Sequence, residues 1–499
     1  MHVATLVEMI ESAYADRRLL GAEGGSALTG PELGRTVRLG AAKLAGRGAV
    51  VYVGENHAFL PCLALSAAWA GVPFVPLNYR QDDSTLARLI AAQPDPAVIT
   101  DEASAARVGT SGNVLDDWLA DLEERAPLSE PAEDADAVAI VLYTSGTTSA
   151  PKAALLRHRH LMAYLLGSVE FGSAGPDDAS LIAVPPYHVA GVANMLSNLY
   201  SGRRLVYQAK FSPDAWLETV RAERVTHAMV VPTMLARLVD HLGGAAADVP
   251  TLRSLSYGGS KVSERVIRAA LAAFPGTAFV NAYGLTETAS TIAVLGPDDH
   301  RAAVASGDPA VARRLASAGK VLPSVDVEIR GADGSPVPAG SSGILHVRGE
   351  QISGEYASGT LLDADGWFCT RDQAMLDEEG FLFIDGRADD TIIRGGENIA
   401  PAEIEDVMLG HPEVAEACVV GVPDDVWGNR IVAAVVPTRA ASVTPDEIQA
   451  LVRAKLRGSK TPDLVVFRES LPHTDTGKLL RRVVAADVVS TVAARSLQS

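Results

Sequence analysis

The sequence is poor in cysteine and in positive charge, and each shortage excludes a class of protein. Only three cysteines occur in 499 residues, and Cys62, Cys369 and Cys418 lie far apart. That spacing gives neither a disulfide framework nor a zinc site, and each cysteine is expected to be a small buried apolar residue in a reducing compartment. The formal net charge of -18 leaves no basic surface for nucleic acid or anionic lipid.

Long uninterrupted hydrophobic runs are also missing. The longest apolar stretch, 59–77, is broken by three prolines and by Gly71, which predicts a helix followed by a strand and no membrane span. The first eleven residues mix acidic and apolar side chains without a basic start or a cleavage site. They favour an amphipathic helix over a secretory signal. A cytoplasmic protein is therefore expected.

What the sequence does contain is a repeated alternation of short apolar strands and helices. Helices are expected at 33–44, 58–70 and 86–92, and strands at 48–54, 72–77, 97–100, 180–184, 204–207, 227–231 and 278–281. This alternation predicts parallel α/β sheets covered on both faces. After residue 321, polar and apolar residues alternate around a turn at 331–334, which predicts antiparallel strands in a small β-barrel subdomain.

The last hundred or so residues have a pattern of their own. Helices are expected at 401–410 and 444–457, and strands at 417–422, 431–436 and 464–467. We therefore expect two domains, 1–388 and 389–499. The fold class is α/β, with a large N-terminal domain of two layered sheets and a small, mobile α+β C-terminal domain.

Hydroxyl groups, a glycine and a lysine directly follow the strand expected at 137–142. The run is Tyr143-Thr144-Ser145-Gly146-Thr147-Thr148-Ser149-Ala150-Pro151-Lys152. Backbone N–H groups, hydroxyls and one cation can there bind the same anion. The spacing is not that of a Walker loop, so a P-loop NTPase fold does not follow. Taken alone, such a run is more often a surface turn rich in serine and threonine.

Five such polar or glycine-rich segments stand at the ends of expected strands, where open parallel sheets bind ligands. They are 144–152, 185–188, 257–260, 283–288 and 370–372. Together with 386–390, 394–405 and 472–478, they resemble, in the same order, the motifs of the adenylate-forming superfamily of acyl-CoA synthetases, aryl-CoA ligases, luciferases and peptide-synthetase adenylation domains. The resemblance implies two half-reactions. A carboxylate attacks the α-phosphate of ATP and releases pyrophosphate, and a thiol then takes the acyl group and releases AMP.

The resemblance also implies roles for the motif residues. The β- and γ-phosphates would be bound by Thr144, Ser145, Gly146, Thr147, Thr148 and Lys152. Glu287, after a tight turn at Tyr283-Gly284, would bind Mg²⁺, and Thr286 would bond the α-phosphate. The nucleotide site would also include Gly258, Gly259, Ser260 and Asn281, with Tyr283 stacked on adenine and Asp372 and Arg387 at the ribose. Lys478 would bond both the substrate carboxylate and the α-phosphate.

A domain rotation is implied for the second half-reaction. Asp389 matches the hinge of the family, about which the small domain would exchange the Lys478 loop for the loop of Gly395 and Gly396. The resemblance also implies that Trp427 is one of the cofactor-binding residues.

Three positions depart from the family pattern, which commonly has glycine at Ser149, Ala153 and Arg371. A Cβ at the first two is expected to stiffen the phosphate loop and to slow pyrophosphate release. Because arginine stands at position 371, the sequence does not predict the backbone conformation beside Asp372.

The implied acyl pocket comprises Tyr187, His188, Val189, Ala190, Gly191 and Met195, with His188 at its mouth. Neither an acidic residue nor an arginine occurs in 185–199, which disfavours amino acids and dicarboxylates. A fatty or other apolar acid is expected. The acceptor is the pantetheine thiol of CoA or, alternatively, of an acyl carrier protein. A non-catalytic paralogue that binds nucleotide or acyl ligand is a further alternative, and the chain could be a monomer or a homodimer.

Overall fold

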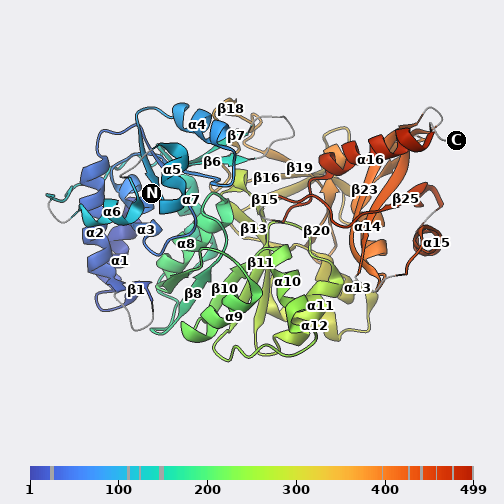
Figure 1. Ribbon diagram of the computed structural model, residues 1–499, viewed down its shortest axis with the longest axis horizontal. Helices are drawn as coiled ribbons and strands as arrows, with labels where there is room; N and C mark the ends of the chain where they lie inside the picture. The colour runs from blue at the N-terminus through green and yellow to red at the C-terminus, as the bar shows by residue number, and fades with distance from the viewer. Residues whose placement is uncertain are drawn as a thin grey trace.

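The computed structural model spans residues 1–499 and describes 1–22, 27–109, 113–122, 125–144, 151–395, 397–424, 427–438, 442–456, 458–474 and 477–496. Figure 1 shows the blue N-terminal elements at one end, the green sheet in the middle and the orange-to-red C-terminal elements at the other end. Among the described residues we find no helix with the length and apolar character needed to span a bilayer.

One sheet of the N-terminal part has seven strands. Their spatial order is β18 (Gly359–Thr360), β17 (Glu355–Tyr356), β7 (Lys152–Arg157), β6 (Val138–Thr144), β4 (Phe74–Leu77), β3 (Ala49–Val53) and β5 (Pro96–Thr100). The helices in this region of the sequence are α1 (Ala4–Ala13), α2 (Gly30–Leu44), α3 (Leu60–Trp69), α4 (Asp83–Ala91), α5 (Glu102–Val108) and α6 (Leu115–Ala120). Every residue of β3 and of α3 is buried, because both are almost wholly apolar and Ser66 in α3 donates its hydroxyl to the carbonyl oxygen of Val37.

The second sheet has thirteen strands in one hydrogen-bonded row. Their order is β15 (Asp326–Arg330), β16 (Ser342–Arg348), β19 (Phe368–Leu376), β20 (Phe381–Arg387), β14 (Gly319–Val321), β13 (Ser290–Leu295), β12 (Ala278–Leu285), β11 (Ser254–Gly258), β10 (His227–Val230), β8 (Ala179–Ile182), β9 (Arg204–Tyr207), β1 (Arg18–Gly21) and β2 (Ala27–Thr29). The antiparallel strands expected after residue 321 are confirmed, and they continue this sheet through β14, which pairs with both β13 and β20.

The helices between these strands are α7 (His158–Ser168), α8 (Val189–Ser201), α9 (Pro213–Ala222), α10 (Pro232–Leu242), α11 (Glu264–Ala273), α12 (Pro297–Ala305) and α13 (Pro309–Ala312). Strands β8, β9, β10, β11 and β12 are joined by parallel pairings. Their carboxyl ends therefore meet at one edge of the sheet, where the polar segments after β8, β11 and β12 are brought together.

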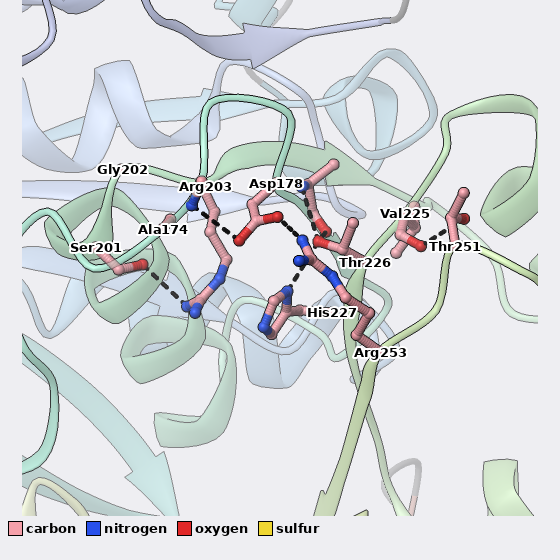
Figure 2. A network of polar contacts seen from close by, with 12 residues as sticks. Ala174, Asp178, Ser201, Gly202, Arg203, Val225, Thr226, His227, Thr251 and Arg253 are labelled. Atoms are coloured by element: carbon pink, nitrogen blue, oxygen red, sulfur yellow. Dashed lines mark hydrogen bonds and ion pairs between the residues drawn. The ribbon is translucent and has the colours of Figure 1, made fainter. Parts of the chain in front are cut away.

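The opposite, amino edge of the same strands is tied together by polar side chains. Figure 2 shows Asp178, which precedes β8, paired with Arg253, which precedes β11. Thr226, directly before β10, exchanges two hydrogen bonds with Ala179, of 3.1 and 3.0 Å. These bonds hold the three strands in register from the edge that lies away from the expected site.

The C-terminal part is a three-stranded sheet with a helical layer on each face. It contains β23 (Val414–Asp424), β24 (Gly428–Pro437), β25 (Leu464–Phe467), α14 (Pro401–Leu409), α15 (Pro445–Lys455) and α16 (Arg481–Ser496), after a hairpin of β21 (Ile392–Arg394) and β22 (Glu397–Ile399). Val419 faces the core shared with α14 and α15, whereas Val420 faces the core shared with α16. This alternation follows the two-residue period of a strand. The α/β class is confirmed, and the boundary at Asp389 stays a prediction.

Two local expectations are wrong. Tyr283 and Gly284 do not form a turn, because β12 continues to Leu285 and pairs with β13 across an irregularity at these two residues. A Cβ at Gly284 would lie 1.9 Å from the carbonyl oxygen of Ser290, so the close neighbouring strand explains the glycine. Cys369 is exposed, unlike Cys62 and Cys418, because its position in β19 faces solvent.

Candidate active site

The segment after β11 requires glycine for two separate reasons. A Cβ at Gly258 would lie 2.3 Å from the carbonyl oxygen of Ala282 in the paired strand β12. Gly259 has a φ of 95°, which side-chain-bearing residues rarely adopt. The backbone before Ser260 is therefore free of side chains at the carboxyl edge, beside Asn281, which pairs with Tyr257.

Tyr283, Asp372 and Arg387 form one hydrogen-bonded group. The Tyr283 hydroxyl donates to Oδ2 of Asp372 at 2.5 Å, and Nη1 of Arg387 donates to Oδ1 at 2.8 Å. The Asp372 side chain is only 6% exposed. Burial and the neighbouring Asp372 raise the pKa of Tyr283 well above its usual value, so the hydroxyl remains a donor. The structure thus brings together three residues predicted from separate motifs and fixes the carboxylate from both sides.

Arg371 occupies a backbone conformation that favours glycine. Its φ is 61°, and a side chain costs about 1–2 kcal/mol in this left-handed region. The strand β19 therefore keeps a left-handed residue beside Asp372 in spite of the arginine. Nη1 of Arg371 lies 3.6 Å from Oδ2 of Asp389, the predicted hinge residue.

Glu287 lies in the short 3₁₀ turn η1 (Thr286–Thr288), directly after β12. The carboxylate accepts a hydrogen bond at Oε1 from the hydroxyl of Tyr356. Among the described residues, no group of three or more His, Cys, Asp or Glu side chains could hold a metal ion. A single carboxylate at this edge nevertheless fits Mg²⁺, since this ion commonly takes one or two carboxylates and completes its shell with phosphates and water.

The expected phosphate run joins two antiparallel strands. Thr144 ends β6, Lys152 begins β7, and the two residues pair directly; Lys152 is exposed. Ser145, Gly146, Thr147, Thr148 and Ser149 lie outside the described residues. Ala153 pairs with Tyr143 within the strand pair, so its Cβ does not stiffen a loop as expected, because a strand already constrains the backbone.

Lys478 lies on a tight turn before α16 and is exposed. Its N–H donates to Oγ1 of Thr474 at 3.0 Å, and its carbonyl oxygen accepts from the N–H of Thr474 at 2.7 Å. Gly477 has a φ of 76°, and a Cβ there would lie 2.2 Å from the side chain of Thr233. Because Thr233 is in the first turn of α10, directly after β10, the lysine turn touches the carboxyl edge of the large sheet.

A small cavity of about 10 Å³ lies beside α8, which is room for about one water molecule. Of the six predicted pocket residues, Gly191 and Met195 line it, whereas Tyr187, His188, Val189 and Ala190 do not. Its other lining residues, missed from the sequence, are Asn56, Leu60, Phe74, Ile182, Val184, Pro186, Val192 and Tyr207. The Tyr187 and His188 rings are adjacent, with centroids 4.6 Å apart. The missed residues come from both sheets, and no local pattern marks them.

The loop predicted to accept pantetheine is described only in part. Gly395 donates its N–H to the carbonyl oxygen of Trp427 at 2.8 Å, and the guanidinium of Arg394 lies 5.4 Å from the centroid of the Trp427 ring. Trp427 is 52% exposed. Gly396 lies outside the described residues.

Residues 11–357 match the family model described as AMP-binding enzyme, and residues 403–478 match that of the AMP-binding enzyme C-terminal domain. The chain belongs to the AMP-binding, adenylate-forming family. It is an AMP-forming acid–thiol ligase. The resemblance stated from its motifs is thereby confirmed.

Three relatives match nearly the whole chain. Feruloyl-CoA synthase from an Amycolatopsis species is 35% identical over 92% of this chain and 93% of the relative. Indoleacetate–CoA ligase from Aromatoleum aromaticum is 32% identical over 90% of each chain. The fatty acid–[acyl-carrier-protein] ligase ScoC from Streptomyces coeruleorubidus is 32% identical over 89% of this chain and 87% of the relative.

Solved structures give the same family. ATP-bound MatB from Rhodopseudomonas palustris superposes with a TM-score of 0.85 at 26% identity, covering 98% of this chain and 99% of the other. O-succinylbenzoate CoA synthetase from Bacillus subtilis, in complex with its acyl-adenylate intermediate, superposes with a TM-score of 0.82 at 26% identity, covering 97% and 98%.

Proposed function

We propose that this ligase activates an apolar, ring-bearing carboxylic acid as its acyl adenylate and transfers the acyl group to CoA. The observation that carries the proposal is the meeting, at one sheet edge, of the Tyr283–Asp372–Arg387 group, the Glu287 turn and the Lys478 turn. Groups that can bind anions lie at this sheet edge, and one cation, Lys478, reaches it from the C-terminal part of the chain. This arrangement suits a reaction that joins two anions, the substrate carboxylate and the α-phosphate of ATP.

The nucleotide would be oriented by the buried group. Asp372 is a two-oxygen acceptor that Tyr283 and Arg387 already hold in position, so ribose hydroxyls can bond to it without reorganisation of the carboxylate. Gly258 and Gly259 leave the neighbouring backbone open to the base. Thr144 and Lys152, near the two ends of the phosphate run, would bind the β- and γ-phosphates together with the residues between them.

Glu287 would bind the Mg²⁺ that accompanies ATP, and Thr286 would bond the α-phosphate. When bound, this ion offsets phosphate charge. The remaining charge builds where the substrate carboxylate approaches the α-phosphate, and the Lys478 ammonium would bond both groups there. The Gly477–Thr233 contact holds the lysine turn against that edge, which fits the first half-reaction.

For the second half-reaction, the C-terminal part would rotate about Asp389. Trp427 is 52% exposed and lies beside Gly395, and an exposed large apolar side chain can become covered by a ligand or another surface. A rotation would turn Trp427, with Gly395, toward the acyl adenylate. His188 would stand between the acyl pocket and the incoming thiol.

The ring acid is supported by the relatives. Two relatives carry the names of ring acids, and Leu60 and Phe74 give the small cavity beside α8 an apolar lining. Oδ1 of Asn56 and the hydroxyl of Tyr207 are buried without a hydrogen-bond partner, which suits a polar ring substituent. The ScoC ligase favours the alternative, a fatty acid loaded onto a carrier protein.

A single assay matrix tests the proposal. Hydroxycinnamate, indoleacetate, octanoate and palmitate are each offered with ATP, Mg²⁺ and either CoA or a holo acyl carrier protein, and products are identified by mass spectrometry. We expect aryl-CoA thioesters as the main products. Acyl-carrier-protein products from palmitate would establish the alternative, and failure of every acid in ATP–pyrophosphate exchange would refute acid activation.

A further inference from the structure

Residues 351–356 hold the turn that carries Glu287. The carbonyl oxygen of Glu287 accepts N–H bonds from Ser353 at 2.8 Å and from Gly354 at 3.0 Å. The side-chain amide of Gln351, which is 1% exposed, donates at 3.0 Å to the next carbonyl oxygen along the chain. The turn therefore cannot shift without breaking buried hydrogen bonds.

The same segment is fastened to the strand that follows the phosphate run. Tyr356 in β17 pairs with Ala154 in β7. Arg157, also in β7, donates to both carboxylate oxygens of Glu355, at 2.8 and 2.6 Å. The hydrogen bond from Arg157 lowers the pKa of Glu355, so the pair stays ionised at neutral pH. One short strand thus links the phosphate run to Glu287.

The hydroxyl of Tyr356 completes this link, because it donates directly to Oε1 of Glu287. A phenolic hydroxyl is protonated at neutral pH and can donate this bond. A bond to one carboxylate oxygen fixes the rotation of the group and hence the direction of the other oxygen.

We propose that Tyr356 is a positioning residue for the divalent cation of the ATP complex. Its hydroxyl holds the Glu287 carboxylate in the orientation that binds the metal, and β17 keeps that orientation in register with the phosphate run. The inference rests on the proposed function, since it takes Glu287 as the cation ligand. Hydrogen bonds to ligating side chains typically contribute tenfold or more to metal affinity.

The test separates metal coupling from general stability. The dissociation constant of α,β-methylene ATP, which resists cleavage, is measured by calorimetry with Mg²⁺ and with EDTA, and the ratio of the two constants reports the contribution of the metal. Tyr356→Phe removes only the hydroxyl. Tyr14→Phe is the matched control, because the Tyr14 hydroxyl likewise donates one buried hydrogen bond, of 2.8 Å to the carbonyl oxygen of Tyr200, and neither residue belongs to the proposed site.

We expect Tyr356→Phe to reduce the metal-dependent ratio about tenfold while the constant in EDTA stays unchanged, and Tyr14→Phe to leave both constants unchanged. Equal weakening with and without Mg²⁺, or an unchanged ratio, would overturn the inference. A Glu287→Gln variant keeps the two failures apart. If it retains the wild-type ratio, the metal role of Glu287 is refuted; if it loses the ratio and Tyr356→Phe does not, only the role of Tyr356 is refuted.

Discussion

The residues proposed to bind the nucleotide and the turn that carries Lys478 differ in burial and in the contacts that hold them. Asp372 is 6% exposed and held by two donors from its own part of the chain. Lys478 is exposed on a turn that reaches the sheet edge through the contact of Gly477 with Thr233. The contrast implies that the proposed nucleotide site is preorganised within the large part, whereas the position of Lys478, the proposed catalytic cation, depends on how the small part is placed.

The largest expected effect is at the lysine. Lys478→Ala should reduce acyl-adenylate formation by about a thousandfold, because no other cation is proposed where the two anions meet. Thioester formation from supplied acyl adenylate should remain within a few-fold of the wild type. Rapid-quench measurement of each half-reaction checks this, and equal losses in both would remove the distinction between the two regions.

A smaller and different effect is expected at the buried carboxylate. Asp372→Asn should weaken ATP binding about ten- to hundredfold, since hydrogen bonds to a charged group contribute about 1.5–3 kcal/mol. Lys478→Ala should leave that affinity nearly unchanged. Calorimetric titration with ATP and Mg²⁺ compares the two variants, and a similar weakening in both would show that the lysine also belongs to the ground-state binding site.

Acidification should destabilise the large part. Burial lowers the pKa of His2, His160 and His227 to about 4 and that of His158 to about 3, from 6.5. A folded-state pKa below the unfolded value means that the unfolded chain takes up protons first. Stability is therefore full above about pH 6.5 and falls as the pH drops toward 4.

Urea unfolding at pH 7.5, 6 and 5 measures this loss through the transition midpoint. His158→Gln should lower the steepness of the pH dependence, because it removes the most strongly shifted of the four groups. A midpoint that does not change between pH 7.5 and 5 would show that these histidines are protonated in the folded chain.

Local patterns were sufficient for most strands and for the motifs that indicated the family. The strands at 204–207 and 464–467 have the predicted bounds, because short apolar runs between polar breaks encode them directly. The extension of β12 to Leu285 was missed, since a Tyr-Gly pair commonly marks a turn and only the neighbouring β13 makes it part of a strand.

The contacts between distant segments could not be predicted. Tyr356 lies in a strand of two residues, which is too short to show a period, and its bond to Glu287 spans 69 positions. Asn56 and Tyr207 line one cavity from separate strand ends. Such pairs are set by the packing of the two sheets, and a single sequence carries no local signal for them.

The placement of Lys478 by contact between the two parts is the central claim, and Gly477→Ala tests it most directly. A Cβ there would lie 2.2 Å from the Thr233 side chain and would also be strained at the φ of 76°, so the turn should shift from the sheet edge while the lysine itself is retained. We predict at least about a tenfold loss of acyl-adenylate formation with unchanged thioester formation from supplied acyl adenylate. Wild-type adenylate formation by this variant would contradict the account.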